Sequence, residues 1–324
     1  MSCPLSTSVL SGFALKIGEL SSAASNIKFN VFVLVYNFLG ISVTVHFIAD
    51  YFLTNEIVSE DLMKGMVICS CLSMPTNMMV VLTVSAKGDE AVALFLATFM
   101  NLLGVFVTPL LIFFFLREEA DIDFLSTYKA VGVRVLTPVG FGLFLRSRNE
   151  DTNAFAEDHK KTLVKIRERL LVYVVYATFC ETFMNENDFT RSQFFVMALS
   201  QLIILLASMV IAWILLFILF NREPTLRVAG LFGCSTKTAA LGIPLISAIY
   251  EDSPKLGIYT LPLLIWYLAQ LIIGTMLSNR LSRFVDYKQA KYEREREERG
   301  YDCGVVGSHI WADTICQGPE PDYH

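Results

Sequence analysis

A lysine inside an apolar stretch is the residue of this sequence whose setting most plainly indicates chemistry. Segment Gly230–Ile249 is apolar enough for a bilayer, but its middle, Cys234–Thr238, reads CSTKT and carries Lys237. A lysine at the centre of a membrane helix costs about 2.5–3.5 kcal/mol on insertion scales. The polar run, with Gly242 and Pro244 behind it, predicts a broken helix, which is tolerated at membrane depth only where it lines protein or a water-filled cavity. We therefore predict a binding site around Lys237.

A second interrupted stretch, Ser73–Asn77 (SMPTN), follows the same plan. In Cys69–Leu116 and again in Gly233–Arg280, the interruption is followed by an apolar half-span, a short charged turn and a long apolar segment containing Pro-Leu-Leu. The distribution of Lys and Arg places the two charged turns on opposite sides of the membrane, which makes the two units inverted relative to each other. Paired interrupted helices in corresponding positions of inverted halves point to the binding site of a secondary transporter.

The ends of the half-helices determine what two facing breaks can do. Half-helix N-termini carry partial positive charge and C-termini partial negative charge. Lys237 could be a fixed cation that neutralises the C-terminal ends, as a bound sodium would, or a group that releases and carries a proton. It could also be a structural lysine that pairs with or caps a helix. Pro75 is likewise either an ordinary kink or, with Asn77 beside it, part of the site.

Composition indicates an all-α polytopic membrane protein. The 324 residues are 54% hydrophobic and only 18% charged, and the mean hydropathy is +0.52. Soluble domains are about 45–50% apolar and about 25% charged. A membrane span needs about 20 mainly apolar residues. Eight full spans are predicted: Ile27–Leu53, Leu62–Ala86, Ala91–Leu116, Phe124–Leu145, Leu170–Met184, Gln193–Phe220, Leu226–Ile249 and Gly257–Phe284.

The two ends of the chain are predicted to differ. Cys3–Leu15 is apolar but short and rich in serine, so we expect it to be the remnant of a helix, with the first helix missing from this sequence. Residues 1–284 are expected to form the transmembrane transporter domain, and residues 285–324 a charged, disordered tail. Within that tail, Tyr287–Arg299 is predicted to extend the last helix. The excess of Lys and Arg on the tail side places the C-terminus in the cytoplasm.

Four segments carry a resemblance to a known family. GDEAVALFLATFMNLLGVFVTPLL, TFCETF, GCSTKTAALGIPL and LPLLIWYLAQ are similar, in this order along the chain, to motifs of the bile acid/sodium symporter superfamily. The closer match is its sodium/bile acid cotransporter 7-like branch, which includes the fungal regulators of calcium homeostasis. The resemblance implies a ten-helix fold of two inverted five-helix repeats, in which two broken helices cross in a core domain and a panel domain rocks against it.

The same resemblance implies a set of site residues. In sodium-coupled members of the superfamily, the ions bind beside the crossover, and an amide stands where this chain has Lys237; this departure argues against coupling to two sodium ions. The candidate substrate- or ion-binding residues are Pro75, Thr76, Asn77, Thr98, Asn101, Cys234, Ser235, Thr236, Lys237, Thr238 and Gln270.

The expected function is therefore secondary membrane transport. The resemblance predicts movement of a small, anionic organic solute by alternating access, with a link to cytosolic calcium homeostasis. A non-transporting membrane regulator that binds a calcium-entry protein and a cation/proton antiporter are the alternatives. No phosphate-binding loop, dinucleotide motif, HExxH or Ser-His-Asp set is present, so an enzyme is not expected. The expected partners are the bilayer of a plasma or secretory-pathway membrane and the solute, without nucleic acid or cofactor; sodium is left open as a coupling ion.

Overall fold

The computed structural model describes residues 26–116, 191–221, 223–250 and 255–298, with isolated residues between 162 and 180. The described segments are helical, which confirms the predicted all-α class. Within the described residues, five helices are long and apolar enough to cross a membrane, and the number is six if one bent pair is counted as a single span. The helices are α3 (Ile27–Val35), the π-turn η1 (Tyr36–Gly40), α4 (Ile41–Thr54), α5 (Glu60–Cys71), α6 (Thr76–Ser85), α7 (Glu90–Phe115), α12 (Arg191–Leu219), α13 (Pro224–Ser235), α14 (Ala239–Ile249) and α15 (Leu256–Glu298).

The first described span, Ile27–Thr54, is one helix with a local defect. α3 and α4 are joined by the five-residue π-turn η1, in which the Ile41 N–H donates to the Tyr36 carbonyl. In an α-helix that N–H would bond to the carbonyl of Asn37 instead. The π-turn therefore frees one main-chain carbonyl, on Asn37, in the middle of the span.

The first predicted break is confirmed. α5 and α6 meet at an angle of 62° across a break of four residues. α5 ends before Leu72, which is extended with φ −74° and ψ 153°. Pro75 further disfavours the α conformation at Met74, the residue before it. α7 then starts cleanly because the Asp89 carboxylate accepts a hydrogen bond of 3.0 Å from the Val92 N–H.

The second break is also present, but it lies earlier than the Gly/Pro pair. α13 ends at Ser235 and α14 begins at Ala239, so Gly242 and Pro244 lie inside α14. The break at residues 236–238 falls within the predicted polar run Cys234–Thr238, so this prediction is confirmed. Gly242 instead allows close packing, since a Cβ there would lie 2.5 Å from Leu72 Cδ1.

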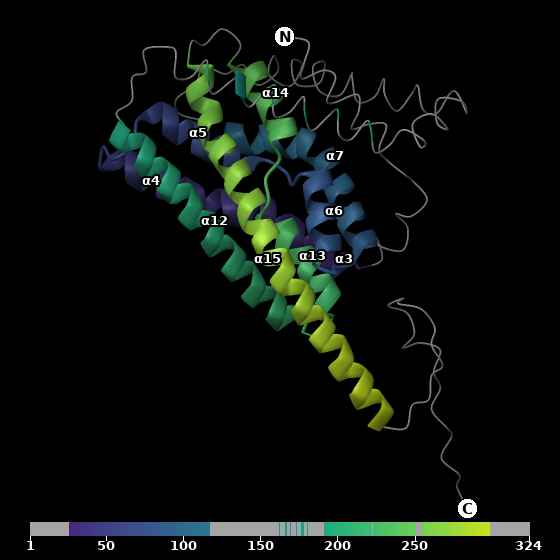
Figure 1. Ribbon diagram of the computed structural model, residues 1–324. Coiled ribbons are helices and arrows are strands. Elements are labelled where there is room, and N and C mark those ends of the chain that lie inside the picture. The colour runs from purple at the N-terminus through teal and green to yellow at the C-terminus, as the bar shows by residue number, and fades with distance from the viewer. Residues whose placement is uncertain are drawn as a thin grey trace, which may run out of the picture.

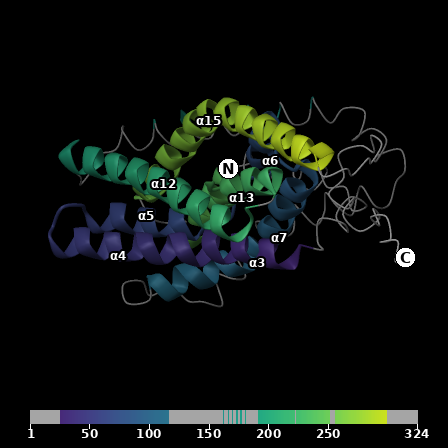
Figure 2. The ribbon, with the colours of Figure 1, turned by 90° about the horizontal axis from the view of Figure 1, so that it is seen from below.

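The helices assemble around α13 (Figure 1). Seen along the bundle, α13 lies in the centre, between α12, α15, α7 and α3 (Figure 2). α15 continues without a break from the membrane to Glu298, and Val285 in it is fully buried, so the helix and its packing extend past residue 284. The predicted charged helical extension is thus observed as far as the structure describes it.

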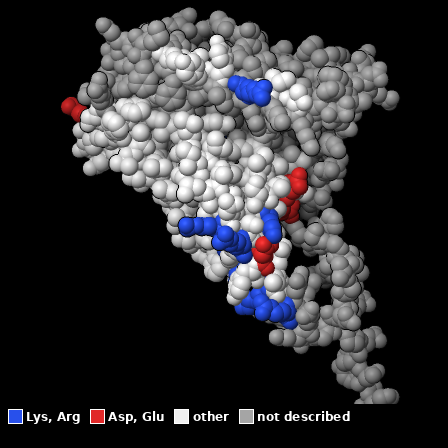
Figure 3. Space-filling view, viewed as in Figure 1, with Lys and Arg blue, Asp and Glu red and all other residues white. Residues whose placement is uncertain are grey.

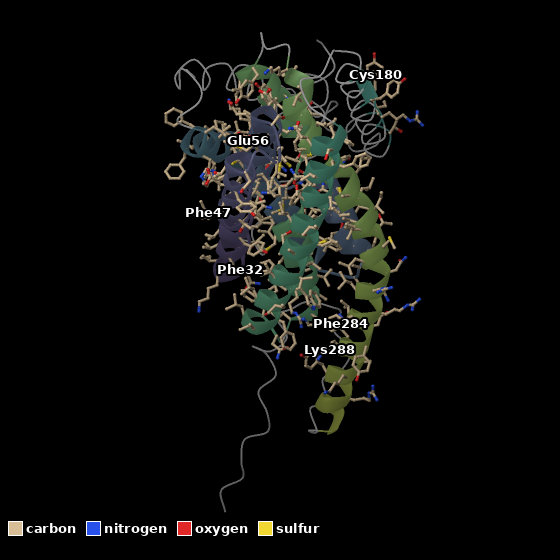
Figure 4. The ribbon with its side chains drawn as sticks, turned by 90° about the vertical axis from the view of Figure 1, so that its left-hand side faces the viewer. Phe32, Phe47, Glu56, Cys180, Phe284 and Lys288 are labelled. Atoms are coloured by element: carbon tan, nitrogen blue, oxygen red, sulfur yellow. The ribbon has the colours of Figure 1, made fainter. Side chains whose placement is uncertain are left out.

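Charged side chains gather at the two ends of the bundle, and the face between them is mostly apolar (Figure 3). In Figure 4, Glu56 lies towards one end, Phe284 and Lys288 towards the other, and Phe32 and Phe47 between them. The end that holds Lys288 also holds these exposed basic residues: Lys28, Lys87, Arg280, Arg283, Lys291 and Arg294. At the other end, Lys64 and Lys255 pair with Glu60 and Asp61.

Several sequence predictions concern residues outside the described part of the chain. These are the remnant Cys3–Leu15, the span Phe124–Leu145, most of the span Leu170–Met184 and the tail from Gly300.

Candidate functional site

The two helix breaks contact each other at the centre of the bundle. The Thr238 N–H, at the start of α14, donates a hydrogen bond of 2.8 Å to the carbonyl of Ser73, in the break between α5 and α6. Residues 235–239 and 71–75 are buried throughout. The structure therefore brings together the two polar interruptions that the sequence places 160 residues apart, as a crossover.

Lys237 projects into this crossover and is completely buried. Its ammonium nitrogen donates to the main-chain carbonyl of Asn37 at 2.7 Å, to the Asn37 side-chain Oδ1 at 3.2 Å and to the main-chain carbonyl of Leu72 at 2.9 Å. All three acceptors are neutral, and an ammonium group has three donors. The three N–H donors of the ammonium are thus each matched by a neutral oxygen acceptor.

Asn37 is the residue that the sequence analysis missed. Its carbonyl is available to Lys237 only because η1 releases it from the helix. Its side-chain Nδ2 donates in addition to the carbonyls of Gly233, Cys234 and Thr236, at 2.9, 3.2 and 3.2 Å. The signal that was available is an asparagine in the middle of an apolar span, because π-turns inside helices are frequent at functional sites.

Gln270 of α15 supports the main chain of residue 237. Its Oε1 accepts from the Lys237 N–H at 2.8 Å, and its Nε2 donates to the Lys237 carbonyl at 2.8 Å. These two bonds replace those that a continuous helix would have made at this residue. Gln270 is fully buried, and its amide stabilises the second break together with the amide of Asn37.

The first break is held by α7. The Asn101 Nδ2 donates to the Met74 carbonyl at 3.0 Å and to Thr76 Oγ1 at 2.7 Å, and Asn101 Oδ1 accepts from Ser73 Oγ at 3.1 Å. Thr108 lies about two turns further along α7 and donates to the Cys71 carbonyl at 3.0 Å. At the C-terminal end of α5, the carbonyls of three successive residues therefore accept hydrogen bonds from side chains of other elements. Ser70 accepts from Ser42, Cys71 from Thr108, and Leu72 from Lys237, which is the charged donor among the three.

Two of the predicted site residues are not engaged. Asn77 Nδ2 and Thr98 Oγ1 are buried atoms that have no hydrogen-bond partner. Asn77 lies in the first turn of α6, and no side chain caps α6 or α14 at its N-terminus. Uncapped helix N-termini attract negative charge, so the side of the crossover formed by the starts of α6 and α14 is suited to an anionic or hydrogen-bond-accepting group.

The remaining predicted residues shape the crossover without presenting free polar atoms. Ser235 Oγ donates to the Leu231 carbonyl and Thr236 Oγ1 to the Phe232 carbonyl, both at 2.7 Å. Such bonds to the preceding turn weaken helix propagation and help to end α13 where it does. Pro75 occupies the N-cap position of α6 without a side-chain hydrogen bond, and Cys234 is a buried thiol. Within the part of the chain that the structure describes, His, Cys, Asp and Glu form no group suited to a metal ion.

Two broken helices that cross inside a bundle of membrane-spanning helices define the class of this protein: it is a multi-pass integral membrane protein of the transporter type. The comparisons with known proteins agree. The chain belongs to the SBF-like CPA transporter family, whose model matches residues 8–283, and the family predicted from the motifs is confirmed.

Individual relatives are named as transporters. The chain is 29% identical over 274 residues to sodium/bile acid cotransporter 7 of Rattus norvegicus, a match that covers 82% of this chain and 78% of the relative. It is 28% identical over 295 residues to sodium/bile acid cotransporter 7-A of Xenopus laevis, covering 89% and 84%. A putative symporter of Escherichia coli (strain K12), YfeH, is 24% identical over 244 residues, covering 74% and 72%. These relatives support a membrane transporter; the fungal calcium-regulator branch stays a prediction.

Proposed function

We propose that this transporter is a secondary carrier that moves a small organic anion by alternating access, with the Lys237 ammonium in the place of a coupling cation at the crossover. The observation that carries the proposal is the ring of three neutral oxygens around the buried ammonium. Carbonyl oxygens at a half-helix C-terminus are the ligands that transporters use for a coupling ion. Here the covalently attached charge of Lys237 occupies them.

The solute class follows from the opposite side of the crossover. The starts of α6 and α14 are uncapped, and Asn77 contributes an unpartnered donor beside one of them. With Lys237 supplying a positive charge nearby, this side favours an anion over a cation. The relatives named for bile acids, which are organic anions, are consistent with this choice.

The orientation belongs to the same proposal. Among the described residues, the end that holds the α15 extension carries seven exposed or partly exposed basic residues, of which Lys87 pairs with Asp286. The described lysines at the other end, Lys64 and Lys255, are paired with carboxylates. We place the former end, with the C-terminus, in the cytoplasm by the positive-inside rule. The membrane in which the protein resides is expected to be the plasma membrane or one of the secretory pathway.

The experiment is uptake into proteoliposomes of a panel of labelled anions, taurocholate and smaller carboxylates, with and without a sodium gradient. The expected result is sodium-independent uptake of at least one anion, reduced at least tenfold in Asn77→Leu. Because the Asn77 amide nitrogen has no partner in the fold, that variant should retain its thermal stability. Equal uptake by the variant and the wild type would remove Asn77 from the site.

The other readings of the sequence give different outcomes in the same vesicles. A non-transporting regulator of calcium entry would show no flux while retaining a calcium phenotype in cells. A cation/proton antiporter would acidify or alkalinise the lumen when a cation gradient is applied. Uptake that requires sodium would show that Lys237 does not replace the coupling ion.

A further inference from the structure

A second buried cation lies in the first turn of α13, at the opposite end of that helix from the crossover. Arg227 is 1% exposed, and its Nε and Nη1 nitrogens have no hydrogen-bond partner. No carboxylate of the described residues forms an ion pair with it. Buried charges in proteins are normally paired and hydrogen-bonded, because an isolated guanidinium loses its hydration. Arg227 therefore has donors without an acceptor.

Aromatic rings surround the guanidinium. Its Cζ lies 4.5 Å from the ring centroid of Trp213 and 4.8 Å from that of Phe217, both on α12, and 5.3 Å from that of Phe284 on α15. Ring faces stabilise a cation by electrostatic attraction, but they accept its N–H groups poorly. The rings thus stabilise the charge at the seam of α12, α13 and α15. They leave the Nε and Nη1 donors without an acceptor.

The position of this seam indicates where that ligand comes from. α12 ends at Leu219 and α13 begins at Pro224, so Arg227 lies close to the end of the bundle that carries the basic residues. Phe217 is 48% exposed on the apolar outer surface, and Arg280 and Arg283 are exposed on α15 beside Phe284. Aromatic and basic residues together mark the level of lipid headgroups.

The nearest carboxylate on the same element does not fill this role. Glu223 occupies the N-cap position of α13, but its side chain makes no capping hydrogen bond. The pKa of its carboxyl group is raised by burial and by the neighbouring negative charge of Asp89. The Glu223 Oε2 is itself a buried atom without a hydrogen-bond partner, and among the described residues no ion pair joins Glu223 to Arg227. A raised pKa also makes the carboxyl group easier to protonate, which lessens its repulsion of an anion nearby.

We propose that Arg227 binds a phosphate group at the seam of α12, α13 and α15. The positive charge and the unpartnered Nε–H and Nη1–H donors match the oxygens of a phosphate group, an anion that arginine favours. An anionic phospholipid supplies such a group at this depth, and free phosphate is the other source. The site is separate from the crossover and does not depend on the proposed transport function.

The test compares thermal unfolding of the full chain in nanodiscs of phosphatidylcholine alone with nanodiscs that also contain phosphatidylglycerol, at high salt to screen diffuse attraction. A parallel arm adds inorganic phosphate to the phosphatidylcholine discs. The wild type should gain about 2 °C or more in its unfolding midpoint from one of the two additions. Arg227→Gln should lose at least half of that gain, and the exposed control Arg283→Gln should keep it.

Each outcome decides the proposal. A gain from phosphatidylglycerol that depends on Arg227 supports a lipid site, and a gain from phosphate alone that depends on Arg227 supports a free-phosphate site. No gain, or a gain that Arg227→Gln retains in full, overturns the proposal. If Arg227→Gln does not fold, Arg227→Lys is measured instead, because lysine keeps the charge but lacks the planar guanidinium donors. A gain in unfolding midpoint that Arg227→Lys retains in full also overturns the proposal.

Discussion

Replacing Asn37 by leucine tests the arrangement on which the crossover depends. Leucine has nearly the same shape as asparagine, so the packing in the middle of the span should be kept. The substitution removes the Oδ1 acceptor from the Lys237 ammonium and the Nδ2 donor from the carbonyls of Gly233, Cys234 and Thr236. The main-chain carbonyl of Asn37 should still reach the ammonium.

The magnitude follows from the groups left without partners. The Gly233 carbonyl would accept the residue-237 N–H in a continuous helix, but that N–H donates to Gln270 instead. Asn37 is therefore its donor, and the same holds for the other two carbonyls at the break. A buried polar group left unsatisfied costs about 1–3 kcal/mol, so we expect a loss of about 3–5 kcal/mol of unfolding free energy from Asn37→Leu.

A double-mutant cycle with Lys237→Met separates this from a general packing defect. Lys237→Met alone removes the buried charge and strands the oxygens that it held. If the two side chains act on each other, the loss in the double variant should fall short of the sum of the single losses by about 1–3 kcal/mol.

The assay is denaturant or thermal unfolding of the purified protein in one detergent. Thr44→Val is the control for Asn37→Leu, because Thr44 lies in the same span as Asn37 but is exposed. The losses from Thr44→Val and Lys237→Met should be additive within about 0.5 kcal/mol. Additivity of Asn37→Leu with Lys237→Met would refute the reasoning, because it would mean that the asparagine and the lysine do not share an energetic unit.

Three further predictions concern the surroundings of the site. Gln270→Leu strands a main-chain N–H and C=O and should lower the unfolding free energy by about 2–4 kcal/mol, whereas Gln270→Glu, which keeps the acceptor, should lose less; unfolding curves in detergent compare them. Gly242→Ala should destabilise by about 1–3 kcal/mol through overlap with neighbouring leucines, while Gly40→Ala, whose Cβ would meet nothing nearer than 3.6 Å, should not; equal midpoints would contradict the close packing. Because the pKa of Glu223 is raised in the folded state, ionisation of this carboxyl destabilises the fold above that pKa, so Glu223→Gln should unfold at a higher temperature than the wild type at pH 7–8 and lose this advantage as pH falls towards the unfolded value of about 4.3; a constant difference across pH would refute the assignment.

The sequence by itself determined the class of the protein and the position of its chemistry. Long apolar segments require helices in a bilayer, because only intra-segment hydrogen bonds satisfy the backbone there. A lysine and a proline-containing polar run inside such segments then mark the two breaks, and both are found at residues 72–75 and 236–238. The motifs around Lys237 were specific enough to identify the family.

The tertiary structure decided how those breaks are held. No local pattern shows that the Asn37 carbonyl is released by a π-turn, because the freed carbonyl is satisfied only when a distant ammonium donates a hydrogen bond to it. The polar run Cys234–Thr238 marked the second break in the sequence, but the hydrogen bonds that Asn37 and Gln270 supply from other helices determine where within this run the helix ends. Sequence indicates where a membrane helix can break, and donors and acceptors brought from elsewhere in the fold decide where it does, since an unsatisfied backbone group in hydrocarbon is too costly to persist alone.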